Sequence, residues 1–144
     1  MIVIGSDHGG YQLKEVLKAH LTSQNISFLD VGCSGEACDY PDIAAQAVQK
    51  ILDGTCSEGI LCCGTGIGIS IAANRYPGIR AAVVSDPLAA TLTKQHNNAN
   101  ILCMGGRMIG EEMGKACVDA WLHASFAGGR HTIRIEKLEK ERTL

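Results

Sequence analysis

GILCCGTGIGISIAAN, residues 59–74, joins an apolar run to a helix-forming run through a turn that contains three glycines. The run at 59–63 is continuously apolar, which is typical of a strand buried on both faces. Glycines at the alternate positions 64, 66 and 68 allow a sharp turn and a close approach of the backbone to a ligand. The stretch therefore predicts a buried strand, a tight turn and a helix that ends near Asn74.

Four further apolar runs flank this unit and alternate with amphipathic segments. With 59–63, the predicted strands are 1–4, 28–31, 81–84 and 101–104. The spacing of apolar residues predicts helices over 13–21, 43–52, from the glycine turn to 74, 87–95, 111–124 and after Gly128-Gly129. Strict alternation of strands and helices requires parallel pairing through right-handed crossovers. The predicted fold class is therefore α/β, a three-layer α/β/α sandwich around a parallel sheet.

Length and charge narrow the function classes. The chain has 144 residues, of which 46% are hydrophobic and 19% are charged, and this predicts one domain over residues 1–144. The net charge is −2 and no dense basic stretch occurs, so we expect no nucleic-acid or anionic-membrane partner. No apolar run approaches the ~20 residues that cross a bilayer, and no leader pattern opens the chain. We expect a soluble, cytoplasmic protein.

Seven cysteines are many for this length, and an odd number cannot all form disulfides. No C-x-x-C motif and no His/Cys cluster with zinc spacing occurs, so we expect no metal. We interpret most of the cysteines as small buried hydrophobic residues, kept reduced by their compartment.

Cys63 differs from the other cysteines because it ends a predicted strand directly before a helix. This location favours the thiolate form, and the glycine turn supplies amide groups that can hold a developing oxyanion. Such a thiolate can act as a nucleophile or as a general base. By strand periodicity Cys62 points to the opposite face of the sheet and belongs to the core.

Other glycine-loop sites fail on spacing. A dinucleotide fingerprint requires a glycine at 69 or 71, where this chain has isoleucine, and no P-loop lysine is present. A cysteine phosphatase requires an arginine six residues after its nucleophile, which is also absent. Asp86, 22 residues after Gly64 at a strand end, keeps a nucleotide-binding module open as an alternative.

Ionisable residues follow the predicted strands, at the edge where parallel sheets bind ligands. Asp7 and His8 follow the first strand and Arg107 follows the last; Asp7 caps a helix or contacts a ligand. His96 can exchange protons near pH 7 and lies at the same edge if the helix before it spans 87–95, unless it only ends that helix.

Arg130 and Arg134 share one face of a helix, which suits a phosphate group or an ordinary solvated surface. Together with the thiolate, the histidine and the oxyanion loop, these arginines fit proton transfer next to a carbonyl of a phosphorylated metabolite. No metal or organic cofactor is needed for that chemistry.

Six motifs, in order along the chain, resemble ribose-5-phosphate isomerase type B. They are GSDHGG at 5–10, DYP at 39–41, CGTGIGISIAAN at 63–74, RAA at 80–82, QHN at 95–97 and GGRH at 128–131. The resemblance implies a Rossmann-like five-stranded parallel sheet and a homodimer or tetramer whose active sites draw residues from both subunits. It also implies interconversion of ribose 5-phosphate and ribulose 5-phosphate in the pentose phosphate pathway, without a metal or cofactor.

The same resemblance assigns roles to individual residues. Cys63 matches the base that moves a proton between C2 and C1, Thr65 assists it, and His96 matches the acid/base that opens the furanose ring. The loop that holds the enediolate comprises Gly64, Gly66, Ile67 and Gly68; the sugar contacts are Asp7, His8, Tyr40 and Asn97; and the phosphate contacts are Arg107, Arg130 and Arg134. Ile69 stands where another branch of the family has a glutamate, so the chain resembles the cysteine branch.

Two alternatives remain beside the nucleotide-binding module. The family also includes isomerases of allose and galactose 6-phosphates, and these share most of the motifs. The chain can also be a non-catalytic subunit of a hetero-oligomeric isomerase, although Cys63 and His96 argue against that.

Overall fold

A computed structural model describes residues 1–140, so the last residues of the predicted domain, 141–144, lie outside the described part. The strands are β1 (Ile2–Ser6), β2 (Phe28–Asp30), β3 (Glu58–Cys63), β4 (Ala81–Val83) and β5 (Ile101–Gly105). The helices are α1 (Tyr11–Ser23), α2 (Tyr40–Leu52), α3 (Ile67–Ala73), α4 (Pro87–Asn97), α5 (Glu111–His123) and α6 (Arg130–Glu139).

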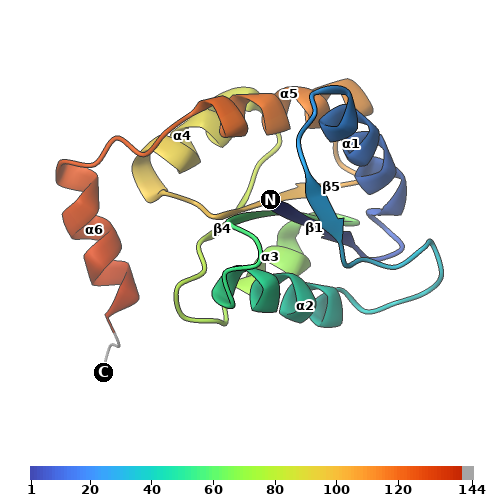
Figure 1. The fold of residues 1–144 in the computed structure, drawn as a ribbon, viewed down its shortest axis with the longest axis horizontal. Coiled ribbons are helices and arrows are strands. Elements are labelled where there is room, and N and C mark those ends of the chain that lie inside the picture. The colour runs from blue at the N-terminus through green and yellow to red at the C-terminus, as the bar shows by residue number, and fades with distance from the viewer. Residues whose placement is uncertain (141–144) are drawn as a thin grey trace.

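The five strands form one parallel sheet in the order β2-β1-β3-β5-β4. Helices α1, α4 and α5 cover one face of the sheet, and α2 and α3 cover the other (Figure 1). Helix α6 stands at the side of the molecule, beyond the end of α4 (Figure 1). The α/β/α sandwich predicted from strand–helix alternation is confirmed. Across residues 1–140, no helix combines the length and the apolar character that crossing a membrane requires.

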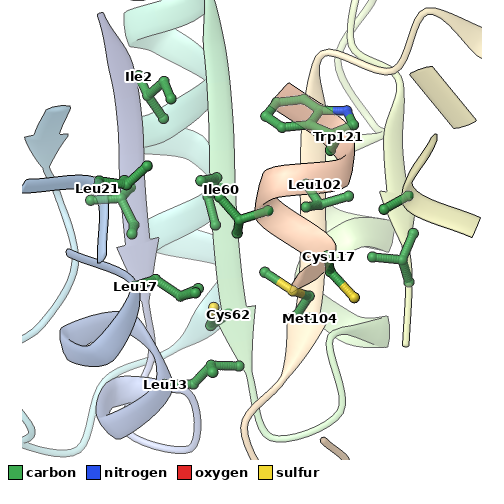
Figure 2. Close-up of a cluster of buried hydrophobic side chains, with 14 residues drawn as sticks. Ile2, Leu13, Leu17, Leu21, Ile60, Cys62, Leu102, Met104, Cys117 and Trp121 are labelled. Atoms are coloured by element: carbon green, nitrogen blue, oxygen red, sulfur yellow. The ribbon is translucent and has the colours of Figure 1, made fainter. Parts of the chain in front are cut away.

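Two hydrophobic clusters, one on each face, hold the layers together. Cys62 packs with Leu13, Leu17 and Met104 in the cluster beneath α1 and α5 (Figure 2). Cys63 belongs to the other cluster, beneath α2 and α3. Because successive strand residues point to opposite faces, the two adjacent thiols lie on different sides of the sheet, as the sequence predicted.

The outer strands differ from the prediction that all strands are buried on both faces. Every residue of β1 and β5 is buried, whereas β2 and β4 lie at the sheet edges and are only partly covered. Val83 of β4 is 42% exposed. Apolar composition alone does not distinguish an edge strand from a central one, because strand order is set by how the crossovers pack.

A buried ion pair anchors the segment after β2 to α1. Lys14 is 1% exposed, and its Nζ donates to both carboxylate oxygens of Asp30 (3.0 Å each) and to the carbonyl of Cys33 (3.0 Å). Partial burial works to raise the pKa of Asp30, but hydrogen bonds from Lys18, the Gly32 amide and Lys14 outweigh it and hold this pKa below its ordinary value. The carboxylate therefore stabilises the fold at neutral pH, and its contribution is lost as acid protonates it.

We predict that Lys14→Ala lowers the free energy of unfolding by about 3 kcal/mol, because it removes a fully buried side chain together with its hydrogen bonds to the Asp30 carboxylate and the Cys33 carbonyl, although Lys18 still pairs with Asp30. Urea denaturation followed by circular dichroism measures the change. Lys137→Ala, at an exposed lysine of α6, is the control and should shift the value by less than about 0.5 kcal/mol. Equal losses in the two variants would contradict the role given to the buried pair.

Candidate active site

The turns that follow β1, β3 and β5 meet at the carboxyl edge of the sheet, the edge where the strands end. Backbone hydrogen bonds join them: Asp7 N donates to Cys62 O (3.3 Å), Gly106 N to Cys63 O (2.8 Å) and Arg107 N to Gly64 O (3.0 Å). The turn after the central strand β3 is therefore held from both sides. These main-chain contacts hold the turn in shape.

Glycine is required where these turns touch. A Cβ atom on Gly10 would lie 2.4 Å from the carbonyl carbon of Cys62, and one on Gly106 would lie 2.6 Å from the carbonyl oxygen of Gly9. Gly66 has φ +77°, and a Cβ there would lie 2.8 Å from the carbonyl carbon of Met104. Any larger residue at these positions would push apart the backbones of the turns that follow β1, β3 and β5.

Cys63 lies at the centre of this arrangement. Its Sγ accepts a hydrogen bond from the Gly66 amide at 3.1 Å, and the residue is 4% exposed. A main-chain donor therefore faces the sulfur at the end of the central strand. Complete burial raises the pKa of Cys62 to about 12, with a smaller contribution from Cys63, so Cys62 stays protonated at neutral pH.

The turn after β1 brings Asp7 and His8 to the same edge. Asp7 Oδ1 accepts from the amides of Gly9 (2.9 Å) and Gly10 (3.1 Å), so its carboxylate shapes the turn, while Gly10 is the N-cap of α1. The exposed His8 places Nδ1 3.3 Å from the carbonyl oxygen of Cys38. That contact orients the imidazole and links it to the loop before α2.

Three more of the predicted residues surround the glycine turn. The Tyr40 ring lies over Gly68, where a Cβ would be 2.8 Å from the ring, so a glycine there provides the space for the tyrosine. Thr65 Oγ1 accepts from the Ile67 amide at 3.2 Å. The Arg107 guanidinium runs beside Gly64, where a Cβ would be 3.3 Å from one of its nitrogens. The carboxyl edge thus gathers a thiol, a carboxylate, an imidazole, a phenol and a guanidinium.

His96 and Asn97 lie at the opposite edge, so the expectation that His96 is at the polar edge is wrong. Both residues belong to the last turn of α4, which ends two residues later than predicted. This helix follows β4 at the carboxyl edge and runs back along the length of the strands before the neighbouring strand β5 begins. Its final turn therefore lies at the amino edge, where the strands start. The prediction assumed that this helix ends at residue 95. The observed end at Asn97 does not change the edge of the sheet at which the helix finishes.

The hydrogen bonds around Asn97 fix the location. Arg80 Nε donates to the carbonyls of Asn97 (3.1 Å) and Asn98 (3.0 Å) just before β4, and Gly59 N at the start of β3 donates to Asn100 O (2.9 Å). A strand rises about 3.3 Å per residue, so the four steps of β3 from Gly59 to Cys63 separate the two edges by roughly 13 Å.

Arg130 and Arg134 accompany His96 rather than Cys63. Both are exposed on α6, and His131, which follows Arg130 in the GGRH motif, stacks on His96 with ring centroids 4.4 Å apart. The Ala127 amide donates to Gln95 O (3.0 Å), and Glu139 at the far end of α6 pairs with Arg80. The arginines and the histidine therefore form a second group of polar side chains.

The sequence motifs assign no contact to several residues that lie at these two edges. Arg80 had a signal in the RAA motif, and His131 had one in GGRH, but neither motif says what its side chain contacts. The Cys38 carbonyl that meets His8 had no signal, because any residue supplies a carbonyl. Asp86 has a structural role: its side chain accepts from Ala89 N (2.8 Å) and caps α4, which removes the reason to assign it to a nucleotide.

Comparisons with known proteins agree on one family. The sequence pattern of the family described as Ribose/Galactose Isomerase matches residues 2–138. Ribose-5-phosphate isomerase B of Escherichia coli K12 is 47% identical over 138 residues, covering 95% of this chain and 93% of that protein.

Two solved structures have the same fold. Ribose 5-phosphate isomerase B of Thermotoga maritima is 50% identical, with a TM-score of 0.94 and coverage of 96% of each chain. Ribose-5-phosphate isomerase B of Clostridium thermocellum is 45% identical, with a TM-score of 0.94 and coverage of 96% of this chain and 94% of that one. The chain belongs to the ribose/galactose isomerase family.

Proposed function

We propose that this chain interconverts ribose 5-phosphate and ribulose 5-phosphate, with Cys63 as the base. The observation that carries the proposal is the Cys63 thiol, held by the Gly66 amide at the end of the central strand, in the glycine turn that joins β3 to α3. The family match and the similarity to ribose-5-phosphate isomerases of type B support the same reaction. We further propose that the chain acts as one isomerase domain and works in the cytoplasm, where its seven free cysteines stay reduced.

The reaction requires two proton transfers at neighbouring carbons. The Cys63 thiolate removes the proton from C2 of the open-chain aldose, and the electron pair forms the C1–C2 double bond of an enediolate. Amides of the turn from Gly64 to Gly68 stabilise the negative oxygen, with Thr65 beside them. The thiol then returns the proton to C1 while a hydroxyl proton moves from O2 to O1, which gives the ketose. Asp7, His8 and Tyr40 contact the sugar.

Before this chemistry, a closed furanose must open. That step needs a group to protonate the ring oxygen, and we assign it to His96. The assignment has a geometric consequence: His96 and Cys63 of one chain lie at opposite edges of its sheet. We therefore propose that a second copy supplies His96 and Asn97, together with Arg130 and Arg134 as phosphate ligands, to the carboxyl edge that carries Cys63.

An exposed apolar surface favours this pairing of two copies. Helix α3 and the edge strand β4 pack against each other, and both carry large uncovered side chains. Ile67 and Ile71 of α3 are 52% and 61% exposed, Val83 of β4 is 42% exposed, and Leu88 at the start of α4 is 67% exposed. Apolar groups gathered in this way mark surfaces that other proteins cover. The surface lies next to the glycine turn, so a copy bound there would be close to Cys63.

A coupled isomerase assay with the purified chain tests the reaction. We expect kcat/KM for ribose 5-phosphate to exceed the values for allose 6-phosphate and galactose 6-phosphate by about tenfold or more. A preference for a hexose phosphate would overturn the assigned sugar and keep the reaction class. A chain that is inactive alone on all three sugars would be a non-catalytic subunit.

We predict that Cys63→Ala lowers kcat for both directions by about 10²–10⁴-fold or more, because the base is lost. Binding of the sugar phosphate, followed by calorimetry, should survive. The matched control is Cys62→Ala, whose protonated thiol faces the core; it should cost about 1 kcal/mol of stability and little activity. Wild-type turnover in Cys63→Ala would refute the mechanism.

We predict that two inactive variants restore each other. Cys63→Ala and His96→Asn are refolded together, so that half of the pairs are mixed and one site in each mixed pair has both native groups. About a quarter of the wild-type turnover of ribose 5-phosphate should return, because a symmetric pair contains two equivalent sites. Each variant refolded alone is the control. No recovery in the mixture would mean that both groups act within one chain.

A further inference from the structure

His131 makes a contact that the proposed chemistry does not use. Its imidazole is stacked on that of His96, with centroids 4.4 Å apart and ring planes inclined by 10°. His131 is 8% exposed, whereas its neighbours Arg130 and Thr132 are exposed. The ring is thus turned inward from the first turn of α6, away from the face that carries the arginines.

His96 occupies a position that needs support. It is the second-last residue of α4, and the chain leaves the helix through Asn98 at φ +44°. Final helical turns are held by fewer hydrogen bonds than helix interiors, so their side chains are less fixed. The neighbouring residues Thr93 and Asn97 are occupied with each other, their side-chain oxygens being 3.3 Å apart. The ring that lies parallel against His96 is that of His131.

The charge state of His131 suits this contact. Its burial lowers its pKa, and the nearby His96, Arg130 and Arg134 lower it further. A ring that stays neutral presents an uncharged π face to its neighbour. It can therefore stack on His96 both when His96 is neutral and when it carries the extra proton.

The segment that carries His131 is itself fixed at both ends. Before α6, the Ala127 amide donates to Gln95 O (3.0 Å), one residue from His96. At the end of α6, Glu139 pairs with Arg80, and Arg80 also holds the carbonyls of Asn97 and Asn98. The helix that carries the stacked ring is therefore held to the end of α4 by contacts on both sides of His131.

We propose that His131 is a positioning residue: its ring packs on the imidazole of His96 and holds it in the orientation required to protonate the furanose oxygen. The inference rests on the role of His96 under the proposed function. His131 itself transfers no proton and binds no phosphate. Its effect should therefore fall on ring opening and leave proton transfer at carbon intact.

The substrate separates these two steps. Ribose 5-phosphate must open before it reacts, whereas ribulose 5-phosphate has no free C5 hydroxyl and cannot close to a furanose. Exchange of deuterium from solvent into C1 of ribulose 5-phosphate reports proton transfer at carbon alone. In His131→Ala we expect ribose turnover to fall by about 10–100-fold, as misplaced catalytic groups do, while this exchange changes less than about threefold.

His131→Phe is the matched variant, because it retains a flat ring and removes both ring nitrogens. It should recover most of the ribose turnover that His131→Ala loses. If His131→Phe is as impaired as His131→Ala, the nitrogens matter and the stacking role is wrong. Equal loss of ribose turnover and ribulose exchange in His131→Ala would also overturn it, because a role in the fold or in phosphate binding lowers both. Melting temperatures of the variants identify any loss of fold.

A double-mutant cycle separates this inference from the proposed function. If His131 acts through His96, adding His131→Ala to His96→Asn should cause no further loss of ribose turnover. Additive losses would overturn the positioning role while the proposed function stands. Unchanged ribose turnover in His96→Asn alone would instead remove His96 from the reaction, and the role of His131 with it.

Discussion

The site depends on close contact between the backbones of three turns of the chain at the carboxyl edge. The turns after β1, β3 and β5 approach so closely that Gly10, Gly66 and Gly106 have no room for a side chain. Their hydrogen bonds run between backbones, so the position of Cys63 follows from the sheet register and does not require particular neighbouring side chains. A thiol placed in this way has a main-chain amide as its partner, and that partner cannot rotate away.

The direction of the crossover helices has an equally strong effect. In a parallel sheet each helix starts at the carboxyl edge and ends at the amino edge. Residues in the loops after strands therefore gather on one side, as Asp7, Cys63 and Arg107 do. Residues at the ends of helices gather on the other side of the sheet. His96 lies there, together with the GGRH motif at residues 128–131 that follows α5. One chain of this fold cannot bring both sets together, and an oligomer can.

The sequence predicted the parts of the structure that depend on local chemistry. Alternation of apolar runs with amphipathic helices gave the layers, strand periodicity separated Cys62 from Cys63, and the glycines of the central turn indicated its tightness. It failed where the outcome depends on the path of the chain through space. His96 is adjacent to polar residues in the sequence, but the direction of α4 carries it to the far edge. The coverage of β2 and β4 depended on strand order, and the stacking of His131 on His96 depended on how α6 docks. Neither leaves a pattern of residues.

The distance of roughly 13 Å between the two edges has a consequence for how activity depends on protein concentration. On the two-copy proposal a lone chain has no complete site, so the fraction of working sites follows mass action and falls on dilution below the dissociation constant of the pair. Substrate that touches groups from both chains binds only the pair and shifts this equilibrium towards association. The sugar phosphate would thus promote assembly of the sites that convert it, and catalysis in dilute solution would begin with a lag that shortens as substrate concentration rises.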